Sequence, residues 1–289
     1  MNLRTLATLS IVAILSTPLM AAQIEVTITN HSPADGVYIT PLWVGFHDGS
    51  FDSYNGGLSS QPGLERIAED GDFSLISQDF LAGLTYIDGS NQSATVPSGQ
   101  APSERVDGAI ANGGPIAPGE SASSVFNLYL SGPNRYLSYV SMVLPSNDYY
   151  VANGNPLAHS LGALNGAPVG TSFSFDIGLP GTVNDAGTEV NDFATSAANG
   201  LFGLPGGQTG PNQGADENGV NANVITPFSD FQGIPADFLA TQSELLFNNA
   251  ALYPNGLANI TVTVVPEPAL NGIGGLLGMA LLGLWRRIS

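Results

Sequence analysis

Two short segments carry the side-chain oxygens that a metal site needs. Pro145-Ser146-Asn147-Asp148 directly follows an apolar run, and the acidic stretch Asn184 to Glu189 is built around Gly187. Hard cations such as Ca²⁺ take about six to eight oxygen ligands from carboxylates, carbonyls and water in flexible loops. Gly187 permits a backbone fold in which Asp185 and Glu189 face a common point. On spacing alone, these residues are consistent with either a cation site or a pair of ordinary turns.

The remaining polar residues have simpler interpretations than catalysis. Glu69, Asp70 and Asp72 suggest acid–base hydrolysis by carboxylate pairs, but a solvated helix end explains them more simply. Asp-Gly pairs are turn formers first, and they occur at Asp35, Asp48, Asp70, Asp88 and Asp107. The histidines, His31, His47 and His159, lie far apart in the sequence. The sequence contains no Gly-x-Ser-x-Gly, no His-Glu-x-x-His and no phosphate-binding Gly-x-x-x-x-Gly-Lys motif, so it predicts a non-enzymatic protein.

The amino-acid composition excludes several partners and kinds of chemistry and favours one class of fold. The 289 residues include 24 Asp and Glu against 6 Arg and no Lys, which gives a net charge of -18. Such a surface repels polyanions, so nucleic acid is excluded as a partner. With 36 Gly and 20 Pro, the chain favours strands joined by many turns. The absence of Cys excludes disulfides and thiol chemistry.

Alternating apolar residues predict the strands that would position the two acidic segments. The segments with this pattern are 24–28, 126–130, 173–177 and 260–264. Residues 37–46 form a further strand candidate that Pro41 pushes toward an edge or a bulge, and 136–144 reads as a central apolar strand. Short helices are expected at 63–70 and 75–84, and turns across 97–118 and a long loop at 199–223. Together these elements predict one all-β domain, an antiparallel β-sandwich with short helical insertions.

The N-terminal end is typical of a secretory signal. Arg4 supplies a positive start, an apolar run spans 6–15, and Ala21-Ala22 offers small residues for cleavage. The alternative is a first transmembrane helix, but the apolar run is shorter than the roughly 20 residues that a span requires. We therefore expect residues 1–22 to be a signal peptide.

The C-terminal end has a tripartite order. Pro266-Glu267-Pro268 is followed by the uncharged run 269–285 and then by Arg286-Arg287. This run can just span a thin bilayer as a transmembrane helix with its arginines in the cytoplasm. The plain interpretation is a tail anchor. The order also resembles the PEP-CTERM sorting signal of Gram-negative bacteria, with Ala269 where that family often has Ser or Thr, and the resemblance implies processing by an exosortase.

Removing both ends leaves a domain of residues 23–265 and a sorting signal of residues 266–289. Within the domain, three groups of residues occur in the order found in bacterial spondin N-terminal domains. They are Gly63-Leu64-Glu65 with Ala68-Glu69-Asp70-Gly71-Asp72, Leu137-Ser138 with Ser141-Met142 and Pro145-Ser146-Asn147-Asp148, and Asp185-Ala186-Gly187-Thr188-Glu189 with Asn191. The domain thus resembles that family over residues 23–200. The resemblance implies a C2-like antiparallel sandwich and one Ca²⁺ whose ligands match Asp148, Asp185 and Glu189.

Two positions depart from the family pattern, and neither removes a carboxylate. Asn147 stands where the family has a second Pro, and Glu189 replaces an Asp, which adds a methylene to that ligand. The resemblance implies an exported adhesion or extracellular-matrix module. The sorting signal implies a place in the cell envelope or biofilm matrix of a Gram-negative bacterium, with exopolysaccharide and exosortase as partners and a transient anchor in the inner membrane. The alternatives are a secreted carbohydrate-binding sandwich, with Tyr149 and Tyr150 stacking on sugars, and a secreted hydrolase.

Overall fold

A computed structural model describes residues 21–87, 93–193, 196, 199–208, 210–211, 213–223, 228, 231–233, 238 and 245–267. Strands make up 33% of the described residues and helices 14%, and the sheets are antiparallel. The expectation of a mostly β fold is therefore confirmed. The strands are numbered β1 to β13 along the chain, and their bounds are given below. Their order across the sheets is β10-β13-β1-β7 in one sheet and β12-β11-β9-β8-β3-β6 in the other, where β2 also pairs with β8.

The first sheet contains all four segments that alternate in the sequence. Its strands are β1 (Ala22–Asn30), β7 (Ser121–Leu128), β10 (Ser172–Ile177) and β13 (Ala258–Val264). In β1, Ile24, Val26 and Ile28 are fully buried, while the residues between them are half-buried. Val26 pairs with Val262 of β13, so the apolar faces of the two strands coincide. The predicted shared core of this sheet is confirmed, because strand side chains alternate between two faces and only one faces the second sheet.

The second sheet is larger, and its central strand is buried on both faces. Its strands are β2 (Tyr38–Ile39), β3 (Leu42–His47), β6 (Val106–Ile110), β8 (Tyr136–Leu144), β9 (Tyr149–Ala152), β11 (Asn184–Asp185) and β12 (Ala222–Asn223). Strand β8 is buried throughout after Tyr136, as its continuous apolar pattern predicts. Pro41 divides the expected strand 37–46 into β2 and β3, because proline cannot donate to the ladder. The expected turn region 97–118 contains β6, which the sequence analysis missed.

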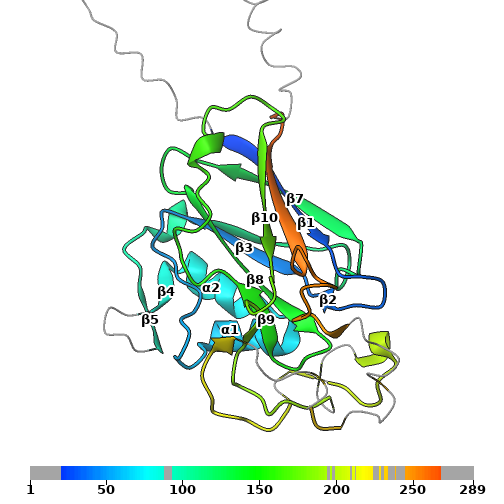
Figure 1. Cartoon of the computed structure of the whole chain (residues 1–289). Helices are drawn as coiled ribbons and strands as arrows, with labels where there is room; N and C mark the ends of the chain where they lie inside the picture. Colours follow the sequence, from blue (N-terminus) through cyan, green and yellow to red (C-terminus); the bar gives the residue numbers. More distant parts are fainter. Residues whose placement is uncertain are drawn as a thin grey trace, which may run out of the picture.

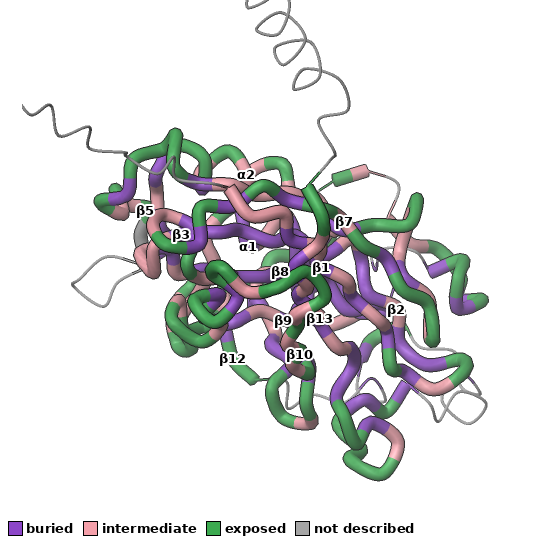
Figure 2. Tube along the Cα trace, turned by 90° about the horizontal axis from the view of Figure 1, so that it is seen from above, coloured by how far each residue is buried: buried purple, intermediate pink, exposed green. Residues whose placement is uncertain are grey.

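Two helices cover the outer face of the second sheet. Helix α1 (Pro62–Asp70) and helix α2 (Ser74–Leu81) form a second apolar cluster with residues of β3, β8 and β9. Figure 1 shows both helices on the side of this sheet away from β1, and Figure 2 shows the buried residues concentrated in the middle of the molecule, with the exposed ones mostly in the outer loops. Helix α1 matches the expected 63–70. The expected helix 75–84 ends earlier, at Leu81, because Gly83 has a positive φ of 80° and Leu84 begins the next strand.

Smaller elements complete the described part. Strands β4 (Leu84–Ile87) and β5 (Ser93–Pro97) form a hairpin, and 3₁₀ turns occupy Pro102–Glu104, Gly162–Leu164 and Asn199–Phe202. The expected long loop 199–223 contains the last of these turns and ends in β12.

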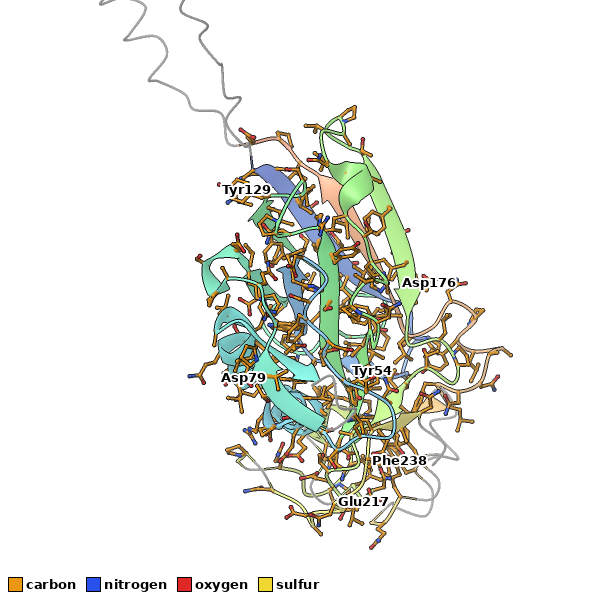
Figure 3. All side chains as sticks on the ribbon, turned by 90° about the vertical axis from the view of Figure 1, so that its left-hand side faces the viewer. Tyr54, Asp79, Tyr129, Asp176, Glu217 and Phe238 are labelled. Carbon is orange, nitrogen blue, oxygen red and sulfur yellow. The ribbon has the colours of Figure 1, made fainter. Side chains whose placement is uncertain are left out.

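The ends of the domain lie together at one end of the molecule. Ile24 pairs with Val264, and the backbone N–H of Val265 donates to the carbonyl of Gln23 over 2.9 Å. Helix α1 and strand β9 lie toward the opposite end (Figure 1). Figure 3 shows the same polarity, with Tyr129 at the end of the domain where β1 begins and Glu217 at the far end.

The two expected terminal segments fall largely outside the described residues. These are the signal peptide, of which Ala21 and Ala22 alone are described, and the transmembrane helix of the sorting signal, which begins beyond Glu267. Across the described ranges, no helix is both long enough and apolar enough to cross a membrane.

Candidate metal centre

Asp148 lies in the turn between β8 and β9, at the end of the molecule away from the chain ends. Its side chain is fully buried. The turn is held by Ser146, whose Oγ accepts a hydrogen bond from the Tyr149 backbone N–H over 2.9 Å. The neighbouring Asn147 donates from Nδ2 to the carbonyl of Val190 over 2.8 Å. The turn is therefore fastened to the segment that carries the other predicted ligands.

The 185–189 turn wraps around the Asp148 carboxylate. Asp148 Oδ2 accepts the backbone N–H of Thr188 at 3.1 Å and that of Glu189 at 3.2 Å. The backbone carbonyl of Asp148 accepts the N–H of Ala186 at 3.1 Å. The second carboxylate oxygen, Oδ1, is buried and has no hydrogen-bond partner. Two loops distant in sequence thus meet at one carboxylate that keeps an unused oxygen.

Asp185 stands beside this carboxylate because β11 pairs with β9. In that pairing Asp185 is opposite Tyr149, the residue after Asp148. Asp185 Oδ1 accepts the N–H of Gly187 at 2.8 Å, and Oδ2 accepts Nδ2 of Asn191 at 3.2 Å. Gly187 has a φ of 64°, as the expected turn requires. A Cβ at Gly187 would also lie 2.6 Å from the backbone nitrogen of Val220, so only glycine fits there.

The electrostatics of Asp148 are those of a buried anion beside another anion. Burial raises the pKa of Asp148 well above its ordinary value, and the charge of Asp185 raises it further. The hydrogen bonds from the backbone of Glu189 and Thr188 act in the opposite direction, and the Glu189 carboxylate adds a smaller repulsion. Burying a carboxylate is costly unless a cation or hydrogen bonds compensate for the lost hydration.

Glu189 contributes its backbone to Asp148, while its carboxylate lies in a different setting. Its side chain is 3% exposed and hydrogen-bonds with Asn147. Burial raises the pKa of Glu189 to about 8, and Glu69 on α1 is the largest charged contributor. The structure thus brings Asp148 and Asp185 together and turns the carboxylate of Glu189 toward α1.

Glu69 is the acidic residue that the sequence analysis misread. The interpretation as a solvated helix end fits Asp72, which is half-exposed and caps Ser74, but Glu69 is 3% exposed. Its Oε2 is buried without a hydrogen-bond partner. The one available signal was its position directly after Ala68, at the border of the apolar face of α1. That signal is too weak to separate a buried glutamate from an exposed one.

A polar cleft adjoins these residues. Its volume is about 280 Å³, and its lining includes Ser59, Ser60, Glu65, Thr188, Asp216 and Asn218. The hydroxyl of Ser60 donates to the carbonyl of Ala186 over 3.0 Å, which fixes this wall against the acidic turn. The cleft gives water and ions a path to Thr188.

The aromatic residues offered for sugar stacking are core residues. Tyr149 and Tyr150 are both fully buried. The ring of Tyr149 stacks on Phe228 with centroids 5.8 Å apart, and the Tyr150 hydroxyl donates to Oδ1 of Asn221 over 2.8 Å. Neither ring is available to a carbohydrate.

Over the described ranges, no group of three or more His, Cys, Asp or Glu side chains is arranged to hold a metal ion. The assignment of Asp148, Asp185 and Glu189 as Ca²⁺ ligands therefore stays a prediction. In comparisons with known proteins, no family model matches this chain, and no curated protein matches it significantly.

Proposed function

We propose that this protein is an exported, non-enzymatic module whose fold is tied together by Ca²⁺ between the 145–148 and 185–189 turns. The observation that carries the proposal is the buried, unpartnered Oδ1 of Asp148 beside the carboxylate of Asp185. The influences on the pKa of Asp148 are burial, two carboxylates and two backbone amides. A divalent cation would offset the repulsion, and Asp148 and Asp185 are the carboxylates that would hold it, while Glu189, the third ligand expected from the sequence, contributes its backbone N–H to Asp148.

The wider setting of the proposal comes from the sequence. We infer a C2-like, spondin-like domain that serves adhesion or the extracellular matrix, exported through the signal peptide and sorted by an exosortase through the terminal helix. The exopolysaccharide or cell-envelope matrix is its partner. The position of the two ends of the domain, near Gln23 and Val265, supports this arrangement, because a domain held there directs β9 and the turn before it outward (Figure 1).

The test of the calcium proposal is a set of melting curves with chelator and with millimolar Ca²⁺. Binding to the folded state alone stabilises it by RT ln(1 + [L]/Kd), about 2.7 kcal/mol when free Ca²⁺ is about 100 times Kd. Asp185→Asn should remove most of this shift and leave the calcium-free stability similar or higher, because a repulsive charge is gone.

Asp48→Asn is the matched control. Asp48 Oδ1 accepts the N–H of Ser50 at 3.0 Å in an ordinary turn, and an asparagine keeps that acceptor. The control should retain the full calcium shift. Identical melting of the wild type in both conditions, or a full shift in Asp185→Asn, would refute the assignment.

Export is tested separately by intact mass spectrometry of native material. The mature protein should lack residues 1–22 and the sorting signal 266–289. A cytoplasmic full-length chain as the main species would contradict this part of the proposal.

A further inference from the structure

We propose that Glu69, Glu189 and Asn147 form a second site for a divalent oxygen-seeking cation, distinct from the Asp148–Asp185 pair. The three side chains come from α1, from the acidic turn and from the turn before β9. The site would therefore join helix α1 to both loops. The ligands expected from the sequence are Asp148, Asp185 and Glu189, and neither Glu69 nor Asn147 is among them.

Three unpartnered oxygens support this second site. Oε2 of Glu69, Oε2 of Glu189 and Oδ1 of Asn147 are each buried without a hydrogen-bond partner. The exposed fractions of these residues are 3%, 3% and 0%. Asn147 is uncharged, so the unpartnered carbonyl oxygen of its side chain is an observation separate from the two acidic residues. Buried polar atoms normally have hydrogen-bond partners, and a bound ion is one of the few explanations for a group of exceptions.

The contacts place these side chains at one point. The side chain of Asn147 hydrogen-bonds with Glu189, and Glu69 is the charged group that raises the pKa of Glu189 most. A Cβ on Gly214 would collide with the Glu189 carboxylate, so the loop that contains Gly214 closes against it. Burial raises the pKa of Glu69 to about 7, which agrees with a carboxylate that lacks a compensating cation.

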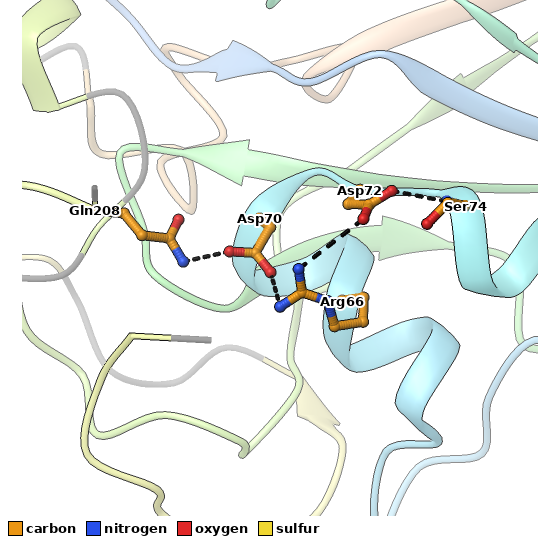
Figure 4. A network of polar contacts seen from close by, with 5 residues as sticks. All are labelled: Arg66, Asp70, Asp72, Ser74 and Gln208. Carbon is orange, nitrogen blue, oxygen red and sulfur yellow. Dashed lines mark hydrogen bonds and ion pairs between the residues drawn. The ribbon is translucent and has the colours of Figure 1, made fainter. Parts of the chain in front are cut away.

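The nearby arginine is already engaged by other carboxylates. Figure 4 shows Arg66 paired with Asp70 and reaching Asp72 at 3.9 Å. Gln208 donates to the other oxygen of Asp70. Arg66 is the weakest of the influences on the pKa of Glu69. The positive charge of Arg66 is thus directed mainly to Asp70 and Asp72, and it compensates Glu69 only weakly.

Thr188 separates the two pairs of carboxylates. Its Oγ1 lies 3.5 Å from Asp148 Oδ2, and its side chain also hydrogen-bonds with Glu69. The single hydroxyl proton serves one carboxylate at a time. Thr188 also lines the polar cleft, so water can complete the coordination of a bound ion from that side.

The experiment counts bound Ca²⁺ on the full chain by equilibrium dialysis and isothermal titration, at about pH 8.5 so that the acids are largely ionised. Wild type should bind two ions. Glu69→Gln and Asp185→Asn should each bind one. Glu65→Gln, which removes the same charge one turn earlier on α1, should still bind two. Circular dichroism in chelator checks that each variant is folded.

The outcomes separate this inference from the proposed function. If Asp185→Asn loses an ion while Glu69→Gln binds as wild type does, the second site is refuted and the proposed function stands. If only Glu69→Gln loses an ion, the second site stands and the proposed Asp148–Asp185 site is refuted. A wild type that binds one ion, lost in both variants, refutes a separate second site. Should Glu69→Gln fail to fold, Glu69→Asp takes its place. It keeps the charge and should lower the affinity for one of the two ions by about tenfold, and unchanged affinities for both ions would overturn the inference.

Discussion

The backbone N–H of Glu189 donates a hydrogen bond to Oδ2 of Asp148 over 3.2 Å, across a separation of 41 residues. The N–H of Thr188 meets the same oxygen. Asp148 therefore acts as a cap for the acidic turn as well as a candidate ligand. Its two possible roles are separable, because hydrogen bonding needs an acceptor oxygen and cation binding needs the charge.

Substitutions at Asp148 should show this separation. Asp148→Ala leaves the N–H groups of half-buried Thr188 and buried Glu189 without an acceptor, so in chelator it should lose about 2 kcal/mol of unfolding free energy. Asp148→Asn keeps one acceptor and removes a buried charge, so it should be at least as stable as wild type in chelator. Both should lose the calcium shift. Urea unfolding with and without Ca²⁺ measures each effect, and equal stabilities for the two variants would contradict the capping role.

Gly187→Ala should be destabilising for two additive reasons. The residue has a positive φ of 64°, and the new Cβ would meet the backbone of Val220 at 2.6 Å. Gly181→Ala is the control, since its φ is 82° but nothing lies within 4 Å of the added Cβ. Positive φ alone costs about 1 kcal/mol, and we expect Gly187→Ala to cost clearly more in thermal unfolding. A similar loss for both variants would mean that the 219–220 backbone yields to the methyl group.

Val262→Asp tests the core of the first sheet. Val262 is fully buried and pairs with Val26 and Phe173. An inward carboxylate without a partner should cost several kcal/mol and can prevent folding. Thr261→Asp, one residue earlier on the opposite face, should change stability little. The comparison uses expression of folded protein and melting temperature. Wild-type-like melting of Val262→Asp would exclude β13 from the core.

His47 should make the folded state acid-sensitive. Burial, and then the charge of Arg105, lower the pKa of His47 to about 3, against a slight opposing effect of Asp48. Below pH 6.5 the unfolded chain binds a proton at His47 that the folded state excludes, so the folded state loses stability as the pH is lowered. One excluded proton corresponds to about 2 kcal/mol between pH 6.5 and pH 5.

His47→Gln should flatten this part of the stability profile. The His47 ring accepts from the Gly49 N–H at Nδ1 and therefore donates from Nε2 to Ser138, and a glutamine amide can replace the latter bond. Chemical denaturation at several pH values between 5 and 7 measures the slope, with the same substitution at exposed His31 as the control. An unchanged slope in His47→Gln would show that another group excludes the proton.

The fold was predictable where burial differs between the two faces of a strand. Ile24, Val26 and Ile28 alternate with polar residues because one face meets the core, and the same holds for β13. Strand β6 was missed because its packing depends on small residues. A Cβ on Gly108 would lie 2.9 Å from Phe126, so glycine is required there, although Asp107-Gly108 looks like a turn. Asp107 instead accepts the indole N–H of Trp43 at 2.9 Å.

The candidate site was only partly predictable for a related reason. Asp148 and Asp185 were recognisable because each lies in a short polar turn of distinctive composition. The burial of Glu69 depends on the packing of α1 against β8 and on the loop around Gly214, and neither contact leaves a local pattern in the sequence. Long-range contacts of this kind decide which of several similar acids loses its water.

The pairing of the first and last strands gives the domain a direction-dependent mechanical strength. Strands β1 and β13 are antiparallel neighbours whose outer ends meet where Gln23 and Val265 are bonded. A pulling force between the two chain ends would open this pair like a zipper, one hydrogen bond after another. A force between the chain end of β13 and the opposite end of the molecule would run along the strands and load all of their hydrogen bonds together. Under the proposed function, a domain tethered by its C-terminal strand and bound to the matrix at the far end would thus be pulled in its stronger direction.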